Sequence, residues 1–142
     1  MTASSTVLVV DDEDQLLRLM VRVVERAGRP VVAADTASEA RRLFREHAEE
    51  IGGVLLDVTM PDGEGAATLL PEFLGERPDL EVIVTSGDAL PEALAVELER
   101  VGGQFIRKPF APKALLRLLE GSGTPSARSA VGSESSGSEG IS

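Results

Sequence analysis

The sequence predicts an α/β fold, a doubly wound five-stranded parallel sheet with helices on both faces. Five short apolar runs rich in β-branched or aromatic residues recur along the chain, namely Val7–Val10, Val31–Ala34, Val54–Leu56, Val82–Val84 and Phe105–Ile106. Their apolar residues are continuous rather than alternating, which is typical of strands covered on both faces. Segments with helical spacing separate the runs, and this regular alternation of strand and helix indicates a parallel sheet.

Local signals place the helices between these strands. The first helical segment carries an apolar stripe with a helical period, formed by Leu16, Met20, Val23, Val24 and Ala27. Gly28 and Pro30 follow this stripe and end the helix. Thr36 with Glu39 three residues later is the pattern of a capping box at the start of the second helix. Further helices are expected at about 66–76, 90–101 and 112–120.

The order of the strands does not follow from the pattern itself. Right-handed crossovers leave few topologies for so short a chain. Among five-stranded sheets of this kind, 2-1-3-4-5 is the commoner, flavodoxin-like order. We therefore expect a flavodoxin-like sheet in the order 2-1-3-4-5.

Length and composition indicate one soluble globular domain. The 142 residues are 42% hydrophobic and 27% charged, which is ordinary for a chain that buries a core. We expect residues 1–5 to be a flexible N-terminus and 6–120 to be the folded domain. Ser and Gly make up 13 of the last 22 residues, so 121–142 is expected to be a disordered tail.

The composition also argues against several classes of protein. The chain has no cysteine, so neither a disulfide framework nor a thiolate metal site is expected. No apolar run approaches the roughly 18 residues that span a bilayer, and no signal-peptide pattern is present at the N-terminus. We therefore expect a cytoplasmic protein without a membrane partner. The net charge of −10 argues against binding of nucleic acid by this chain.

Polar side chains gather where the predicted strands end. Asp11 and Asp12 follow the first strand, Asp57 follows the third, and Lys108 follows the fifth. In the order 2-1-3-4-5 these groups converge on one edge of the sheet, where open α/β sheets bind ligands. Carboxylates that crowd one pocket repel each other unless a cation intervenes.

Asp11, Asp12 and Asp57 are hard oxygen ligands suited to Mg²⁺, with Mn²⁺ as an alternative ion. A carboxylate can also act as a nucleophile and form an acyl phosphate. The alternative interpretation is that Asp11 and Asp12 only favour the N-terminus of the following helix. The residues alone leave both interpretations open.

Four segments resemble the signature blocks of response-regulator receiver domains of bacterial two-component and phosphorelay signalling. They are VLVVDDED at 7–14, LLDVTMPDGEG at 55–65, VIVTSG at 82–87 and FIRKPF at 105–110. Their order and separations match the family, and the similarity covers roughly residues 6–120. The resemblance implies a phosphoryl-accepting switch whose donor is the phospho-histidine of a histidine kinase or phosphotransfer protein. It implies no enzymatic activity beyond self-phosphorylation and self-dephosphorylation.

The resemblance implies a role for each residue at the acidic site. Asp57 corresponds to the phosphoacceptor. Asp12 corresponds to a direct Mg²⁺ ligand, and Asp11 to a second acidic residue that often acts through water. The backbone carbonyl of Thr59 completes the metal site in the family. Thr59 and Asp88 flank the phosphoryl group by analogy and are expected to tune its lifetime.

The resemblance also implies three residues that respond to phosphorylation. Ser86 corresponds to the switch hydroxyl, Lys108 to the ammonium that contacts the phosphoryl group, and Phe105 to the aromatic switch. Thr85 is the alternative for the switch hydroxyl, but Gly87 directly follows Ser86 and the spacing to Lys108 favours Ser86. The alternative for Phe105 is a core aromatic of the last strand.

The bond between Lys108 and Pro109 is a candidate cis peptide. His47 is the only histidine, and we expect it to be a surface residue rather than part of the chemistry.

The output of the switch stays open at this stage. Phosphorylation is expected to remodel the face formed by the helix at 90–101, the strand at Phe105–Ile106 and the helix at 112–120. A downstream protein target or a receiver homodimer would read that face, and the chain would act alone or within a hybrid kinase.

Two other functions compete with the switch. The first is a docking module that works without phosphorylation. The second is a phosphatase of the haloacid-dehalogenase type, but the nucleophile of that type follows the first strand rather than the third.

Overall fold

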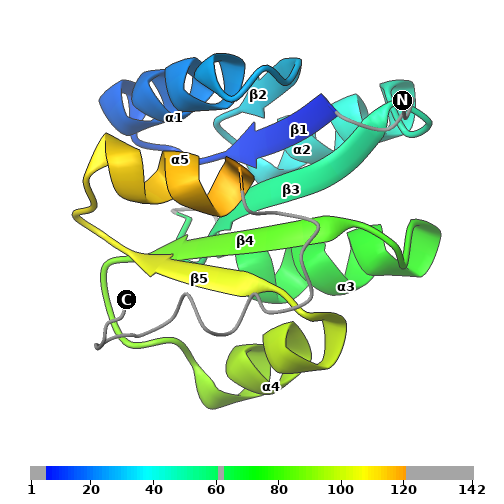
Figure 1. The fold of residues 1–142 in the computed structure, drawn as a ribbon. Coiled ribbons are helices and arrows are strands. Elements are labelled where there is room, and N and C mark those ends of the chain that lie inside the picture. Colours follow the sequence, from blue (N-terminus) through cyan, green and yellow to red (C-terminus); the bar gives the residue numbers. More distant parts are fainter. Residues whose placement is uncertain (1–5, 61–62, 121–142) are drawn as a thin grey trace.

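The computed structural model describes residues 6–60 and 63–120, which form a five-stranded parallel sheet in the order β2-β1-β3-β4-β5 (Figure 1). Strands and helices alternate along these residues, in the order β1 (Thr6–Val10), α1 (Asp14–Arg26), β2 (Val31–Ala34), α2 (Ala37–Glu46), β3 (Ile51–Asp57), α3 (Ala66–Glu76), β4 (Glu81–Ser86), α4 (Glu92–Val101), β5 (Gln104–Arg107) and α5 (Pro112–Glu120). The predicted fold class and strand order are confirmed.

Helices cover both faces of the sheet. Figure 1 shows α1 and α5 on the near face and α2 and α3 on the far face. Successive strand residues belong to two hydrophobic cores, one on each face of the sheet, because their side chains point to opposite faces. The α1–α5 cluster consists of Val7, Val9, Met20, Val23, Val24, Leu55, Ile83, Ile106, Leu115, Leu118 and Leu119. The α2–α4 cluster includes Leu8, Val10, Phe44, Leu56, Leu69, Phe73, Val84, Leu94 and Leu98.

The helix boundaries follow the sequence signals with small differences. Gly28 and Gly102 follow α1 and α4 with φ of 84° and 71°, which a residue without Cβ adopts readily. The Glu39 N–H donates to Thr36 Oγ1 over 3.0 Å, as half of a capping box. The Glu39 carboxylate accepts from Arg42 instead of completing the box. α4 begins at Glu92, later than the predicted residue 90.

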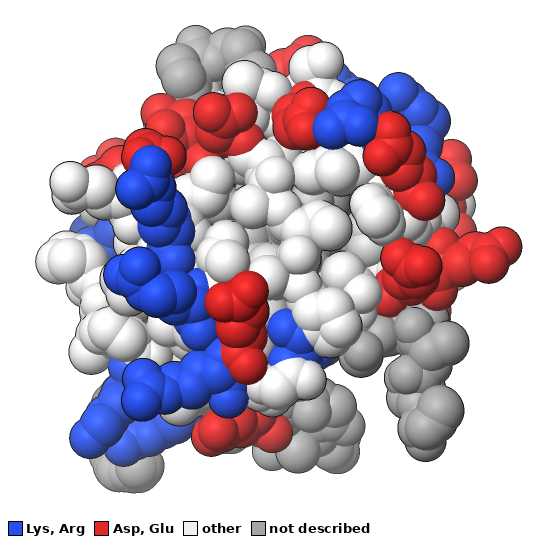
Figure 2. All heavy atoms as spheres, turned by 90° about the horizontal axis from the view of Figure 1, so that it is seen from above, with Lys and Arg blue, Asp and Glu red and all other residues white. Residues whose placement is uncertain are grey.

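Both faces of β2 pack against helices, with Val31 on the α1–α5 cluster and Val32 on the α2–α4 cluster, but the cover is incomplete. This strand lies at the edge of the sheet, where Ala33 is exposed and Val31 and Val32 are half-buried. A short apolar run therefore does not distinguish an edge strand from a central one. Figure 2, which looks down on the side with α1 and β2, shows uncharged side chains in the middle and charged ones around the rim. Charges beside an edge strand oppose pairing with another chain.

The terminal predictions lie outside the described residues, namely the flexible segment 1–5 and the disordered tail 121–142. Within residues 6–60 and 63–120, none of the helices is long and apolar enough to cross a membrane.

Candidate functional site

The parallel pairing of β1 with β3 brings three carboxylates together at the carboxyl edge of the sheet. Asp57 is the last residue of β3, and Asp11 directly follows β1, whose Val10 pairs with Leu56. Asp11 is 0% exposed and Asp57 is 4% exposed, whereas Asp12 is exposed. Carboxylate oxygens of the three residues lie within 4.8 Å of one another. The predicted convergence of these residues is confirmed.

Lys108 completes this cluster from the other side of β4. Its Nζ lies 3.1 Å from Oδ2 of Asp11 and 3.2 Å from Oδ2 of Asp57. The Lys108 N–H donates to the carbonyl of Ser86 over 2.8 Å, which fixes the start of its side chain. The peptide between Lys108 and Pro109 is cis, as predicted.

The two carboxylate oxygens of Asp11 have different kinds of partner. Oδ1 accepts from the Glu13 N–H over 2.8 Å in a local turn. Oδ2 is buried, and its contact among the described residues is the ion pair with Lys108 Nζ. The N-cap residue of α1 is Glu13, so neither Asp11 nor Asp12 caps this helix. The helix-capping alternative for the aspartate pair is therefore not supported.

Burial and charge shift the acid–base behaviour of the cluster. Burial raises the pKa of the Asp57 carboxyl, the charge of Asp11 raises it further, and Lys108 only partly opposes the shift. Burial lowers the pKa of the Lys108 ammonium, but Asp11 and Asp57 more than offset this and raise the pKa above its usual range. The single positive charge of Lys108 thus faces the buried carboxylates of Asp11 and Asp57 and does not fully offset the rise in the pKa of Asp57.

The same residues fit a hard divalent cation. Carboxylate and carbonyl oxygens are the ligands that Mg²⁺ prefers. Carboxylate oxygens of Asp11, Asp12 and Asp57 lie close enough to share one cation, which would add to the neutralisation that Lys108 provides. Thr59 lies beside them as well, since its N–H donates to Oδ1 of Asp57 over 3.4 Å. The donor set therefore suits a hard divalent cation.

An open depression of about 520 Å³ lies over this cluster. It is lined by Asp12, Glu13, Asp57, Thr59, Gly87, Asp88 and Lys108. The sequence did not single out Glu13 and Gly87 as lining residues, although Glu13 directly follows the aspartate pair. The predicted flanking residues, Thr59 and Asp88, both line the depression. Such a depression beside a buried carboxylate can admit a phosphoryl-sized group.

The two hydroxyls at the end of β4 lie differently from one another. Ser86 is buried, and its Oγ accepts from the Asp88 N–H over 3.0 Å. Thr85 pairs with Asp57 in the sheet register, and its carbonyl accepts from the Val58 N–H over 2.8 Å. The side chain of Ser86 is not among those lining the depression. The structure thus keeps the predicted switch hydroxyl next to the site without placing it in the depression.

Phe105 lies away from the acidic cluster. It is a half-buried residue of β5 that pairs with Val84 and packs against the α2–α4 cluster. This position is that of a core aromatic, which was the alternative for Phe105. His47 pairs with the exposed Glu50 near the opposite end of α2 from Thr36, outside the site, as expected.

Gly65 holds the loop after Asp57 against the end of β3. A Cβ at this position would lie 2.1 Å from the carbonyl oxygen of Val58 and 2.8 Å from that of Asp57. Two glycines of this loop differ in their backbone conformation. Gly63 has a φ of 80°, but Gly65 has a φ of −90°, so its role is the close approach rather than a special backbone angle.

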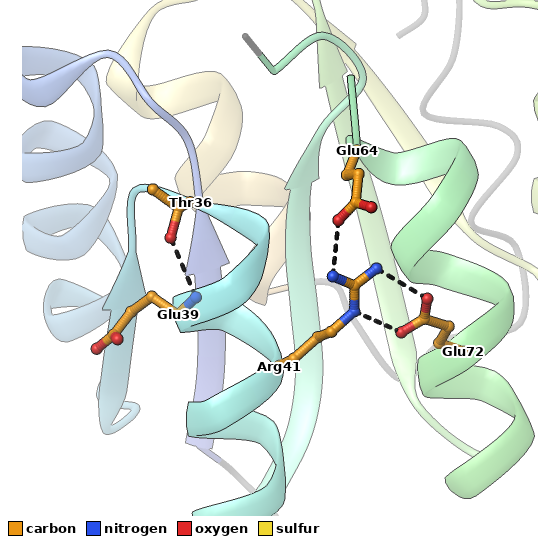
Figure 3. A network of polar contacts seen from close by, with 5 residues as sticks. All are labelled: Thr36, Glu39, Arg41, Glu64 and Glu72. Atoms are coloured by element: carbon orange, nitrogen blue, oxygen red, sulfur yellow. Dashed lines mark hydrogen bonds and ion pairs between the residues drawn. The ribbon is translucent and has the colours of Figure 1, made fainter. Parts of the chain in front are cut away.

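An arginine of α2 ties this loop to α3 (Figure 3). Arg41 donates from Nε and Nη2 to the two carboxylate oxygens of Glu72 over 2.8 and 2.9 Å. Its Nη1 donates to Oε1 of Glu64 over 2.7 Å. Glu64 directly precedes Gly65, so the network supports the segment that packs on Val58. Helical periodicity alone did not predict this contact.

Comparison with known proteins gives one family. The family model described as the response regulator receiver domain matches residues 7–120. The sensor kinase CckA of Brucella abortus (strain 2308) is 36% identical over 118 residues, which are 81% of this chain and 12% of that protein. The chain thus spans a small part of this relative.

Solved structures agree with the family match. A response regulator receiver domain protein of Clostridium thermocellum is 27% identical with a TM-score of 0.70, over 81% of this chain and 90% of that one. A response regulator protein of Burkholderia pseudomallei is 25% identical with a TM-score of 0.65, over 80% of this chain and 65% of that one. The latter structure is described as having a phosphorylated aspartic acid, a calcium ion and citrate.

Proposed function

This chain belongs to the response regulator receiver domain family, and we propose that it is a signalling switch in which Asp57 accepts a phosphoryl group. The observation that carries the proposal is the buried carboxylate of Asp57, with Lys108 Nζ at 3.2 Å and the depression above it. The Burkholderia relative, with its phosphorylated aspartic acid, supports the same chemistry.

The proposed reaction is nucleophilic attack by Asp57. A carboxylate oxygen forms a bond to phosphorus, and the bond between phosphorus and the donor nitrogen of a phospho-histidine breaks. The imidazole leaves, and the product is an acyl phosphate. The raised pKa of Asp57 makes its carboxylate a more basic nucleophile than an exposed aspartate. The donor we propose is a histidine kinase or a phosphotransfer protein.

The Lys108 ammonium is proposed to change its ion-pair partner during this reaction, from the carboxylates to the phosphoryl group. Its ammonium now faces the carboxylates of Asp11 and Asp57. Its raised pKa keeps it protonated, so it can transfer its contact to a phosphoryl oxygen when Asp57 is phosphorylated. Lys108 would then stabilise charge that appears on the phosphoryl group.

The metal is proposed to be held by the carboxylates of Asp11, Asp12 and Asp57 and by the backbone carbonyl of Thr59. Mg²⁺ is the ion we propose, with Mn²⁺ as a substitute, and when bound it would neutralise negative charge on the phosphoryl oxygens. The close approach of the three carboxylates, two of them buried, supports this assignment.

The response to phosphorylation is proposed to run through Ser86 and Phe105. Ser86 would turn its hydroxyl toward the phosphoryl group, and Phe105, which is half-buried now, would change its rotamer and turn further inward. Two packings of the α4–β5–α5 face would then differ in population, because the phosphoryl group contacts one better than the other. A downstream protein or a second receiver would read this face. Thr59 and Asp88 are proposed to tune the lifetime of the acyl phosphate.

The competing functions have less support. The family match indicates a signalling domain and no enzymatic family. The buried nucleophile candidate follows β3, which does not fit a phosphatase of the haloacid-dehalogenase type. A docking module without phosphorylation would not need the open depression above the buried carboxylate of Asp57.

The test is intact-mass measurement after incubation with acetyl phosphate and Mg²⁺. We expect one phosphoryl adduct in the wild type, none in Asp57→Asn, and none when the metal is chelated. Asp35→Asn is the matched control, because Asp35 is exposed and follows β2 at the same edge of the sheet. An adduct that persists in Asp57→Asn would refute the proposed site, and no adduct in any variant would favour the docking module.

A further inference from the structure

Thr85 carries a buried hydroxyl that the proposed function leaves unexplained. The residue is 1% exposed, and its Oγ1 has no hydrogen-bond partner among residues 6–60 and 63–120. Across that part of the chain, the only other buried side-chain oxygen or nitrogen in this situation is Oδ2 of Asp11. Buried hydroxyls are normally hydrogen-bonded, because an unpaired one has lost its water without replacement. Both exceptions flank Asp57.

The sheet places the Thr85 side chain on the same face as the acidic cluster. Leu55, Ile83 and Ile106 all belong to the α1–α5 cluster. Asp57 and Thr85 come two residues after Leu55 and Ile83, so their side chains point to that same face. Thr85 pairs with Asp57 on one side and with Ile106 on the other. Its hydroxyl therefore lies between β3 and β5 at the level of Asp57.

The side chain of Lys108 reaches its two partners from the far side of β4. Its backbone follows β5, whereas Asp57 ends β3 and Asp11 follows β1. Because β4 lies between β3 and β5, the Lys108 side chain has to cross β4 to bring its Nζ to the two carboxylates, one of which belongs to Asp57, the register partner of Thr85. The unpaired hydroxyl thus belongs to the strand that Lys108 crosses, at the level of the carboxylate that the ammonium contacts.

We propose that Thr85 is a positioning residue for Lys108. Once a phosphoryl group on Asp57 draws the Lys108 ammonium away from Asp11, the Thr85 hydroxyl oxygen accepts a hydrogen bond from that ammonium. The inference rests on the proposed function and adds one residue to it. An ammonium has three N–H donors and no acceptor, so it can contact a phosphoryl oxygen and the Thr85 oxygen together. Because Oγ1 lacks a partner in the unmodified protein, this bond is gained only in the modified state. A contact made in one state alone shifts the population toward it.

The test is the affinity for beryllofluoride in the presence of Mg²⁺, measured by isothermal titration calorimetry. Thr85→Val keeps the shape of the side chain and removes the hydroxyl, and we expect binding to weaken about tenfold, the size of one hydrogen bond to a charged group. Thr85→Ser keeps the hydroxyl and should bind within about twofold of the wild type. Thr6→Val is the matched control, since Thr6 is buried in β1 at the other end of the sheet.

Two readouts separate a positioning role from a structural one. Thr85→Val should leave the free energy of unfolding of the unmodified protein unchanged or higher, because the variant loses an unsatisfied group rather than a bond. In a Lys108→Ala background, Thr85→Val should have no further effect on beryllofluoride affinity.

Equal binding by wild type and Thr85→Val would overturn the inference. A tenfold loss that persists without Lys108 would overturn it as well, because Thr85 would then act on the phosphoryl group directly. Failure of the wild type itself to bind beryllofluoride would instead count against the proposed function.

Discussion

Lys108 reaches Asp57 across an intervening strand, with its Nζ 3.2 Å from Oδ2 of the carboxylate. The backbones of the two residues belong to the ends of β5 and β3, which β4 separates. The contact exists because both side chains lie at the carboxyl edge, where an ammonium can approach the buried carboxylates of Asp57 and Asp11. The stability of the unmodified protein and its response to a phosphoryl group therefore depend on the same contact.

Removal of Lys108 should destabilise the unmodified protein. Lys108→Ala leaves Asp11 and Asp57 buried without a cation, and we expect a loss of roughly 3 kcal/mol in the free energy of unfolding without metal. Urea unfolding measures this loss, and added Mg²⁺ should restore part of it. Lys113→Ala on the exposed side of α5 is the control and should stay within about 0.5 kcal/mol of the wild type. A loss no larger than that of the control would contradict the account of the ion pair.

The stability should depend on pH through Asp57. A carboxyl whose pKa is raised by folding favours the folded state below its unfolded pKa, and this contribution is lost as pH rises through the folded pKa. For Asp57 the window therefore begins near the ordinary value of 3.8 and extends upward. Asp57→Asn should be more stable than the wild type at neutral pH without metal, and the gain should shrink as the solution is acidified. A gain that grows toward acid pH would reverse the sign and refute the shift.

A methyl group at position 65 should displace the loop that follows Asp57. Gly65→Ala puts Cβ against the carbonyl of Val58, and we expect a cost of about 1–3 kcal/mol and slower phosphorylation of Asp57. Gly75→Ala is the matched control, because no atom lies within 4 Å of its Cβ position and α3 includes it. That control should be neutral or more stable by up to about 1 kcal/mol. Thermal unfolding and adduct formation distinguish the two glycines.

The tie between α2 and α3 should make a small, salt-sensitive contribution. Arg41→Gln removes a bidentate pair with Glu72 and the contact with Glu64, and we expect a loss of at most about 1 kcal/mol, since the pair is partly exposed. The loss should diminish at high salt. Arg42→Gln breaks exposed pairs within α2 and should cause no measurable change. Equal losses for both arginines would show that the loop contact has no special role.

The strand ends made the acidic cluster predictable from the sequence. Asp11, Asp12, Asp57 and Lys108 each follow a strand, and parallel strands bring their carboxyl ends to one edge. The exposure of Ala33 in β2 was not predictable in the same way, because an apolar run does not reveal whether its strand lies at the edge of the sheet.

Contacts between segments far apart in the sequence were also not predictable from the hydrophobic periodicity. The approach of Gly65 to Val58 and the reach of Arg41 to Glu64 depend on how α2, α3 and the loop pack together. Thr85 shows a signal that was present but unused. The alternation of β4 side chains already places it, and not Ser86, on the face shared with Asp57, whereas spacing within the family favours Ser86 as the switch.

The measurement that tests the central claim most directly is chemical trapping of the acyl phosphate. The protein would be treated with acetyl phosphate and Mg²⁺, reduced with borohydride, digested and sequenced by mass spectrometry. Reduction of an aspartyl phosphate yields homoserine, and we predict homoserine at position 57 and at none of the other aspartates. Homoserine at Asp12 or elsewhere, with Asp57 intact, would contradict the assignment of Asp57 as the phosphoacceptor.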